Sequence, residues 1–424
     1  MIIANISTPL LGLVDTAVMG HLDNASFLAA VALAGLIFNF LFWGFGFLRM
    51  GTAGLSAQAF GANNTLELNA ILLRAMVLAV SISFLLLVFQ QSIAAFSFYL
   101  INCNDSIEPL AQQYFYIRIW SAPACLCQYV ILGWFLGRQN TTSPLLIVVT
   151  TNACNICLDL LFVVHYGMNT EGVALASVLA EYIGLIFGVL LVIRNIPVSS
   201  LSLSWPHLLQ ADKIKAMLLI NGHLFVRTLC LIFTFSFFTV QGAKFGSAIL
   251  AANAILMNFQ TFMAYALDGF AHAAEALIGR ALGAKNKILF QQSIKTTALW
   301  SLLVALLFTL TFNFAGQDII NSLTHLTEVR EPAYEYLPWL IALPLISFSS
   351  FLLDGVFIGA TLSRQMRDCI LLSLFLVFLP SWYYTQDLAN HGLWLALSLF
   401  MLMRTLIMLG YYLYYQRSIM HSLA

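Results

Sequence analysis

The sequence predicts an all-α integral membrane protein with twelve transmembrane helices. They form two six-helix lobes related by a pseudo-two-fold axis along the membrane normal. Composition and an internal repeat support this prediction. Of the 424 residues, 61% are hydrophobic and 8% are charged, and the mean hydropathy is +0.90. A soluble domain needs about a quarter of its residues charged, so most of this protein's surface must face lipid.

The membrane spans follow from the length that a helix needs to cross a bilayer. About 20 apolar residues cross about 30 Å of hydrocarbon, and charged or turn-rich breaks divide the chain into twelve such segments. Their predicted ranges are 1–22, 27–58, 69–99, 112–137, 143–165, 172–194, 213–241, 247–281, 289–314, 333–361, 367–385 and 391–416. The second and the eighth are long enough to tilt or bend.

Charge and composition outside the spans predict the domain organisation. The N-terminal segment has no basic region and no small-residue cleavage site, so we read it as a span and not as a signal peptide. Lysine and arginine collect in the breaks after spans 4, 6, 8 and 10, which predicts that both termini are cytoplasmic. We expect a first lobe at 1–195, a linker along the membrane surface at 196–212, and a second lobe at 213–424.

A repeat relates the two predicted lobes. A shift of 222 residues brings 29–64 onto 251–286 without a gap, with nine identities, and both stretches close with a Gly-Ala-x-Asn turn. GWFLGR (133–138) faces GVFIGA (355–360) at the same shift. Parallel repeats of this kind build transporters whose substrate site lies at the repeat interface, so we expect the site in or between the lobes.

Ionisable groups inside the first lobe are candidates for function because they are costly in hydrocarbon. In span 5, Asn152, Asn155 and Asp159 share one helix face. Asp15 lies about 10 Å inside the outer end of span 1, and Asp159 lies about 9 Å inside that of span 5. Ser177 in span 6 lies at a similar depth, so three helices place polar groups at one level.

This arrangement suits ion coupling. Two carboxylates held close in a low dielectric resist ionising together, so one of them can take up and release a proton. The asparagine amides and the Ser177 hydroxyl can bond to either protonation state or supply oxygens to a sodium ion. Pro9 permits a kink in span 1 that would move Asp15. The alternative is that these groups only hold helices together. A functional role and a packing role also both stay open for Tyr114 at the outer start of span 4 and for Glu181 in span 6.

The second lobe also carries ionisable groups within its spans. They are Arg227, Asp268, His272, Glu275 and Asp354. A central arginine neutralises one of the acids in the simplest reading, and such pairs are often structural. A relay for protons or ions, or a place in the substrate cavity, is the alternative. No short ligand motif organises a metal site, and the lone CxxC at Cys154 and Cys157 lies in an apolar helix.

Several classes of function are not supported. GxSxG, Walker A, HExxH and GxGxxG motifs are missing, and no soluble domain is long enough to hold an ATPase. We therefore expect a protein that is not an enzyme, needs no cofactor and runs on an ion gradient. The formal net charge is zero, which gives no reason to expect nucleic acid as a partner.

Several motifs resemble the multidrug and toxic compound extrusion (MATE) family, and most closely its DNA-damage-inducible (DinF) branch. They are LVDTAVMGHL in span 1, the GANN turn, NICLD in span 5 and LDGVFIGA in span 10. The resemblance implies a monomeric bacterial inner-membrane antiporter. It would export cationic or amphipathic aromatic compounds in exchange for H⁺ or Na⁺ by alternating access.

The resemblance also assigns residues. The family's first-lobe acidic site matches Asp15, Asn155 and Asp159, with Ser177 where relatives often have threonine, and Tyr114 matches another polar position near that site. Asp354 occupies the acidic position of span 10. Span 7, however, has Arg227 where other branches have glutamate, which argues against a second-lobe sodium site.

The alternative function is a flippase of lipid-linked oligosaccharide from the same wider superfamily. Such a protein needs more cationic residues in its central cavity to meet a pyrophosphate. The first lobe offers acids and amides, and these favour a cationic cargo.

Overall fold

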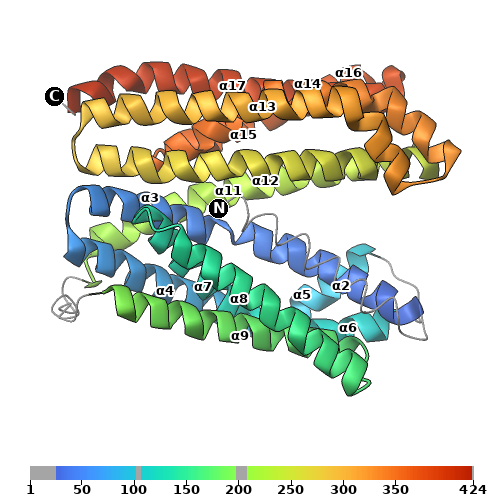
Figure 1. Cartoon of the computed structure of the whole chain (residues 1–424), viewed down its shortest axis with the longest axis horizontal. Coiled ribbons are helices and arrows are strands. Elements are labelled where there is room, and N and C mark those ends of the chain that lie inside the picture. The colour runs from blue at the N-terminus through green and yellow to red at the C-terminus, as the bar shows by residue number, and fades with distance from the viewer. Residues whose placement is uncertain (1–24, 102–106, 197–207, 423–424) are drawn as a thin grey trace. The chain divides into compact units, whose positions relative to one another are not determined.

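The protein is built from helices throughout the part of the chain that the computed structural model describes, which is residues 25–101, 107–196 and 208–422 (Figure 1). Predicted span 1, with Pro9 and Asp15, lies outside these residues. The helices in chain order are α2 (Ala25–Gly44), α3 (Phe47–Gly61), α4 (Thr65–Val88), α5 (Gln90–Ile101), α6 (Glu108–Arg118), η1 (Ile119–Ser121), α7 (Ala122–Gly137), α8 (Thr142–Asp159), η2 (Leu160–His165), α9 (Thr170–Asn195), α11 (Ala211–Ala243), α12 (Ser247–Gly283), α13 (Lys287–Leu323), α14 (Thr327–Gly359), α15 (Ser363–Leu372), η4 (Ser373–Phe378), α16 (Leu379–Tyr384), η5 (Gln386–Leu388) and α17 (Ala389–Ser422).

Within the described residues, eleven helical stretches are long and apolar enough to cross a membrane. Nine of them match their predicted spans to within six residues at each end, and α13 continues to Leu323, nine residues beyond the predicted end at 314. The third span was predicted at 69–99, but α4 ends at Val88 and the chain begins a new helix, α5, at Gln90. The predicted boundary was wrong because the interruption, at Phe89, has no charged residue, proline or glycine beside it to signal a break.

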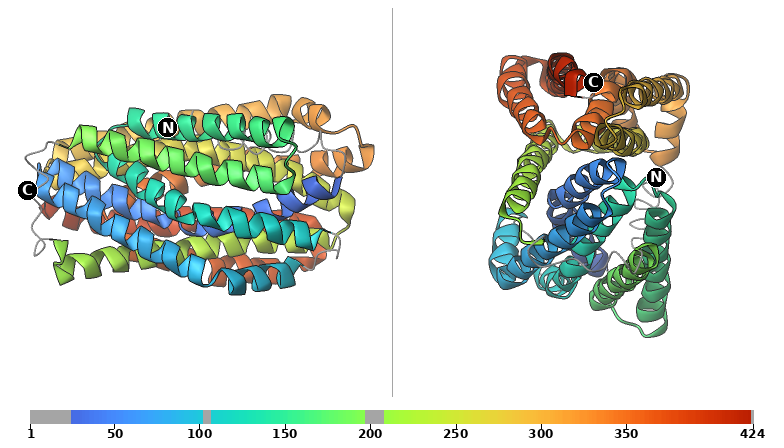
Figure 2. Two further views of the ribbon diagram at one scale, coloured as in Figure 1. Left: turned by 90° about the horizontal axis from the view of Figure 1, so that it is seen from below. Right: turned by 90° about the vertical axis from the view of Figure 1, so that its left-hand side faces the viewer.

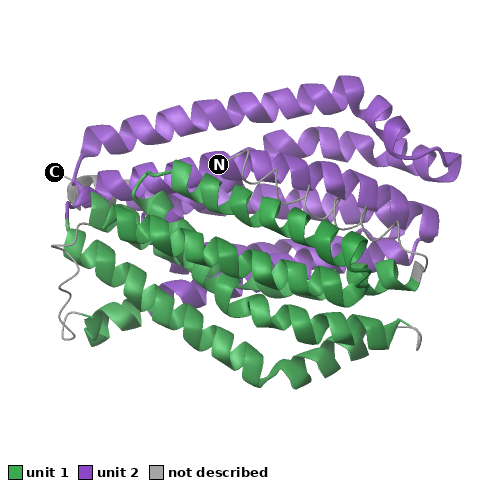
Figure 3. Cartoon of the chain, turned by 60° about the horizontal axis from the view of Figure 1, so that its bottom comes forward, with its two compact units in different colours: residues 1, 3–60, 64–217 green, residues 2, 61–63, 218–424 purple. Residues whose placement is uncertain are grey.

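The described chain divides into two compact units (Figure 3). Unit 1 holds residues 25–60 and 64–217, and unit 2 holds residues 61–63 and 218–422. The division along the chain at 217/218 therefore falls inside α11 (Ala211–Ala243). In each unit the long helices run side by side along a common direction (Figure 2).

Close packing in unit 1 depends on two glycines of α7 that face α3. A Cβ added at Gly133 would collide with the backbone carbonyl of Arg49. One added at Gly137 would lie 2.7 Å from Ala53 O and 2.7 Å from Ala57 N. This small-xxx-small spacing lets two helix backbones touch, as it does between membrane helices in general.

The same contacts recur in unit 2, each shifted by 222 residues. A Cβ at Gly355 of α14 would collide with the carbonyl of Ala271 in α12. One at Gly359 would lie 2.5 Å from Glu275 O and 3.0 Å from Gly279 N. Each of these residues is the counterpart of one in unit 1, so the shifted sequences adopt the same helix–helix packing.

The ends of the paired helices also repeat. In the two Gly-Ala-x-Asn turns, the second residue after each helix has a positive φ. These residues are Asn63 after α3 and Lys285 after α12, with φ of 52° and 50°. The following asparagines, Asn64 and Asn286, cap the next helices by accepting from the amides of Glu67 (3.0 Å) and Leu289 (2.9 Å). An asparagine at an N-cap satisfies an amide that the helix itself leaves open. The turn motif seen in the sequence is therefore a helix stop followed at once by a helix start.

Each unit has a fully buried tryptophan in its interior. In unit 1, Trp134 is fully buried and donates from Nε1 to the carbonyl of Leu68, 3.1 Å away. In unit 2, Trp394 is fully buried and donates to Asn253 Oδ1 at 2.9 Å. Asn253 and Asn390 exchange two further amide hydrogen bonds of 2.7 and 3.0 Å. Buried amides cost little when they are satisfied in this way.

Candidate functional site

A stripe of polar side chains runs along the buried face of α8 in unit 1. Thr151, Asn155 and Asp159 follow one another at four-residue spacing and are 8%, 2% and 0% exposed. Asn155 Nδ2 donates to Ser177 Oγ of α9 over 3.3 Å. The depth estimate from the sequence placed Ser177 level with Asp159, whereas the structure pairs it with Asn155, one helical turn away. Asn152, one residue off the stripe, is only partly buried.

The helix changes its geometry immediately after Asp159. The next six residues, Leu160–His165 (η2), are π-helical. A π-helical segment is rare and is found frequently at functional sites, because the wider turn re-aims the side chains beside it. Asp15 and Pro9, the predicted partner and hinge on span 1, lie outside the described residues, so their relation to Asp159 stays a prediction.

A second tier of polar contacts lies one helical turn farther along both helices. Thr151 Oγ1 lies 3.5 Å from Gln128 Oε1 of α7. Gln128 Nε2 donates to Glu181 of α9, at 2.7 Å to the side-chain Oε2 and at 2.8 Å to the backbone oxygen. Glu181 also faces Arg118 of α6, with 3.7 Å between its Oε1 and the guanidinium. Both tiers together form a polar column: Asp159, Asn155, Ser177, Thr151, Gln128 and Glu181.

An apolar layer closes the column one turn beyond the second tier. A Cβ added at Gly188 would lie 3.4 Å from the side chains of Ile131 and Ile147. At the second tier itself, a Cβ at Gly184 would collide with Thr151 Oγ1, so α8 and α9 approach closely there. Glu181 is therefore the last ionisable group of the column before this apolar layer.

Tyr114, a predicted candidate, is 5% exposed in α6. Its ring packs edge-on against Phe38 of α2, with centroids 6.3 Å apart. The structure places it in an aromatic cluster at the α2–α6 contact.

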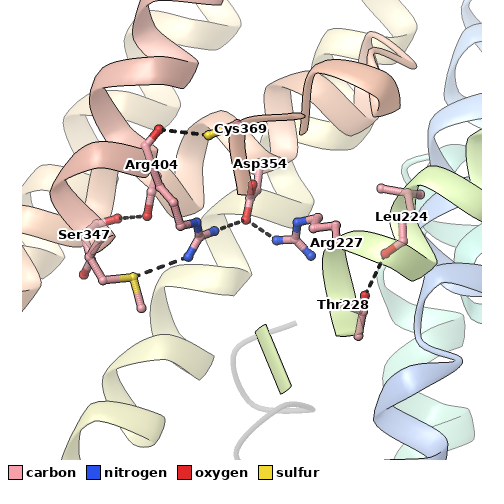
Figure 4. A network of polar contacts seen from close by, with 9 residues as sticks. Leu224, Arg227, Thr228, Ser347, Asp354, Cys369 and Arg404 are labelled. Carbon is pink, nitrogen blue, oxygen red and sulfur yellow. Dashed lines mark hydrogen bonds and ion pairs between the residues drawn. The ribbon is translucent and has the colours of Figure 1, made fainter. Parts of the chain in front are cut away.

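In unit 2 two of the candidate residues, Arg227 and Asp354, form an ion pair. Arg227 of α11 and Arg404 of α17 reach the same oxygen of Asp354 from two sides (Figure 4). The Arg404 Nη2–Asp354 Oδ2 distance is 2.8 Å, and the three residues are 3–7% exposed. The acid that Arg227 neutralises is thus Asp354. The second arginine was not predicted, because Arg404 lies in the last span at a depth that hydropathy alone does not fix.

The other acids of unit 2 lie along α12. Glu275 is 1% exposed, and its Oε2 is 3.6 Å from His272 Nδ1. Asp268 is partly buried, two turns before Glu275. Among the described residues, no group of three or more His, Cys, Asp or Glu side chains is arranged to hold a metal ion.

Comparison with known families decides what this arrangement belongs to. The sequence model of the MatE family matches residues 1–161 and 224–383, which is most of the chain. The chain belongs to the MatE family. The two matched stretches begin 223 residues apart (224 minus 1), close to the 222-residue shift that relates the two units.

Individual MATE relatives agree with this assignment. The DNA damage-inducible protein F of Escherichia coli (strain K12) is 40% identical over 416 residues, covering 96% of this chain and 88% of that protein. An outward-facing multidrug resistance MATE transporter has the same fold, with a TM-score of 0.84, 17% identity, and coverage of 100% and 94%. So has a Pyrococcus furiosus transporter of the MOP superfamily described as having a reversed polarity of its binding pocket, with a TM-score of 0.85, 16% identity, and coverage of 99% and 94%.

The chain is therefore a multi-pass membrane transporter of the MATE family and a homologue of DinF. Sequence reasoning missed three residues of its polar column or of the contact beside it: Thr151, Gln128 and Arg118. Thr151 could have been found, because it lies four residues before Asn155 on the stripe. Gln128 could not, because an isolated amide in an apolar run carries no positional signal.

Proposed function

We propose that the protein is a secondary active antiporter that exports cationic or amphipathic aromatic compounds in exchange for H⁺ or Na⁺ by alternating access. The observation that carries this proposal is the fully buried Asp159 beside the Asn155–Ser177 contact in the interior of unit 1. On this proposal Asp15, Asn155, Asp159 and Ser177 exchange the coupling ion.

The physical reason lies in the cost of burying charge. A carboxylate buried away from water is stable only when it is protonated or paired with a cation. Asp159 can satisfy this condition with a proton, a sodium ion or a cationic cargo, so that one cation displaces another. Asn155 Oδ1 is buried and accepts no hydrogen bond from any described residue, which supports a role as acceptor for the protonated acid or for Na⁺.

The setting of the transporter is part of the proposal. The relative from Escherichia coli supports a place in the bacterial inner membrane, and the distribution of Lys and Arg supports cytoplasmic termini. We expect two lobes, 1–195 and 213–424, joined by a linker at 196–212, in a monomer surrounded by lipid. The partners would be small molecules, with no cofactor beyond the coupling ion and no nucleic acid.

The decisive experiment is transport by the purified protein in proteoliposomes with ΔpH and ΔNa⁺ imposed separately. We expect an outward gradient of one of the two ions to drive ethidium into the vesicles and a protonophore or sodium ionophore to stop it. Failure of both gradients to move ethidium would overturn the antiporter proposal.

A flippase of lipid-linked oligosaccharide is the second candidate, and one observation favours it. Arg227 and Arg404 place two buried cations on a single carboxylate in unit 2, and buried arginines suit a pyrophosphate. The same vesicles would test it with a fluorescent lipid diphosphate-sugar. Movement of this lipid across the bilayer, with no gradient-driven ethidium uptake, would establish the flippase.

A further inference from the structure

We infer that the rings of Phe38 and Phe42 and the carboxylate of Glu181 form a binding site in unit 1 for a planar aromatic cation. The Arg118 guanidinium occupies this site, and the cargo binds by displacing it. This inference rests on the proposed export of cationic compounds and assigns a place where the cargo is held.

The position of Arg118 follows from a break in the fourth span. It is the last residue of α6, and it is followed by the 3₁₀ turn η1 and then by α7, whose second residue is Pro123. Tyr182 of α9 donates from its hydroxyl to the carbonyl of Trp120 in that turn, over 3.1 Å. The bond fixes the break beside α9, and this sets Arg118 opposite Glu181.

The guanidinium lies over two aromatic rings. Its Cζ is 5.8 Å from the centroid of Phe38 and 5.6 Å from that of Phe42, and the two rings are 5.5 Å apart on one face of α2. A cation within about 6 Å of an aromatic face is attracted by the ring quadrupole. Two rings and one carboxylate around a flat, delocalised cation are the surroundings that a planar aromatic cation requires.

The contact with Glu181 is loose, so the guanidinium can exchange. Its 3.7 Å separation from Oε1 is too long for a hydrogen bond. The guanidinium donates instead to Ser121 Oγ in the neighbouring turn. Glu181 is held by Gln128 through its other oxygen, at 2.7 Å. The side chains of Arg118 and Glu181 remain 14% and 19% exposed, whereas the Asp354 cluster is more fully buried.

Charge balance connects the site with antiport. While Arg118 faces Glu181, the pair is neutral. A cationic cargo brings one further positive charge into unit 1, and the loss of one proton from the column restores the balance. Glu181 and Asp159 belong to the same polar column, so a positive charge at Glu181 repels a further proton held in that column. Arg118 would thus keep the site filled until a cation that binds better arrives.

Equilibrium binding of ethidium to the full-length protein in lipid nanodiscs, followed by fluorescence anisotropy, tests this assignment. We expect Arg118→Gln to tighten binding by about tenfold, because the internal competitor is gone. Glu181→Gln should weaken binding by about tenfold, since the carboxylate is lost, and Phe38→Leu should weaken it by about threefold. Arg118→Lys, which keeps the charge, should stay within about twofold of wild type.

Matched controls separate a site from a structural ion pair. Arg74 pairs with Glu67 at 2.9 Å in the same unit, so Arg74→Gln should leave ethidium binding unchanged. Phenanthridine, an uncharged planar aromatic probe, should not distinguish Arg118→Gln from wild type. Unchanged or weaker ethidium binding by folded Arg118→Gln would overturn the inference. If that variant does not fold, unchanged binding by Glu181→Gln would overturn it. Neither result would affect gradient-driven ethidium uptake by the wild type, which tests the antiporter itself.

Discussion

The two units have the same helix packing but different polar groups in their interiors. Gly133 and Gly137 pack on α3 as Gly355 and Gly359 pack on α12, at a constant shift of 222 residues. The interior of unit 1 holds a polar column of carboxylates, amides and hydroxyls. The interior of unit 2 holds Asp354 bound by two arginines. The two units therefore share their helix packing, while side chains at other positions give each unit its own electrostatics.

The helices that carry the repeat also differ in continuity. Unit 1 breaks its helix between α2 and α3 at Phe45 and Gly46, whereas α12 runs without interruption through the corresponding residues, Leu267 and Asp268. Glycines at 44 and 46 lower the helix propensity in unit 1, and alanine and aspartate replace them in unit 2. The interrupted helix lies in the unit with the polar column, and the continuous one lies in the unit with the Asp354 ion pairs.

The largest effect on folding should come from disrupting the glycine contacts that the two units share. Gly133→Leu and Gly355→Leu should each abolish folding, because the new side chain would have to enter the backbone of the facing helix. Even ordinary overpacking costs about 1–3 kcal/mol, and here the obstacle is a carbonyl group. Size-exclusion chromatography of fluorescently tagged protein in detergent would measure the loss of the folded peak.

Gly222→Ala is the control for both variants, because a Cβ at Gly222 meets nothing within 4 Å. It should fold normally. If only one of the two leucine variants failed to fold, the equivalence of the two glycine pairs would be wrong.

The next largest effect on stability should distinguish Asp354 of unit 2 from Asp159 of unit 1. Asp354→Asn should lower the free energy of unfolding by about 3–5 kcal/mol, because it leaves Arg227 and Arg404 buried without their carboxylate. Thermal unfolding of the purified variant would show this as a large drop in Tm. Glu335→Gln, at an exposed ion pair with His391, should cost about 1 kcal/mol or less and serves as the control.

Asp159→Asn should have the opposite profile. Asparagine keeps the size and shape of the aspartate side chain and removes only its charge, so the unfolding free energy should stay within about 1.5 kcal/mol of wild type. Ethidium transport in proteoliposomes should be abolished, and the same is expected of Asp15→Asn. Transport at the wild-type rate by either variant, at equal protein content, would exclude that acid from coupling.

Part of this contrast was accessible from the sequence. The 222-residue repeat predicted where helices would pack alike, since a glycine pair at i and i+4 has few other uses in a membrane helix. Spacing placed Asn155 and Asp159 on one face, and depth placed Ser177 level with Asp159, although its contact is with Asn155. The sequence could not place Arg118 over Phe38 and Phe42, because that contact depends on how far the α6–η1 break turns the chain. Nor could it predict η2, since Leu160–His165 contains no proline or glycine to signal a wider turn.

The smallest effects should come from exchanging the residues at the helix break. Gly44 corresponds to Ala266 at the 222-residue shift, and a Cβ at Gly44 would meet nothing within 4 Å. Gly44→Ala should therefore stabilise unit 1 by about 0.5–1 kcal/mol through helix propensity alone. Ala266→Gly should destabilise unit 2 by about 1 kcal/mol or slightly more, because Ala266 is buried and also loses its methyl contacts.

Transport would tell whether the break is used. If bending between α2 and α3 accompanies cargo exchange, Gly44→Ala should slow ethidium transport by about threefold although the protein is more stable, since a stiffer helix resists the motion. Ala266→Gly should leave the transport rate unchanged. Equal rates for both variants would mean that the break is a fixed feature of the fold, and the difference between the units would then lie in their polar interiors alone.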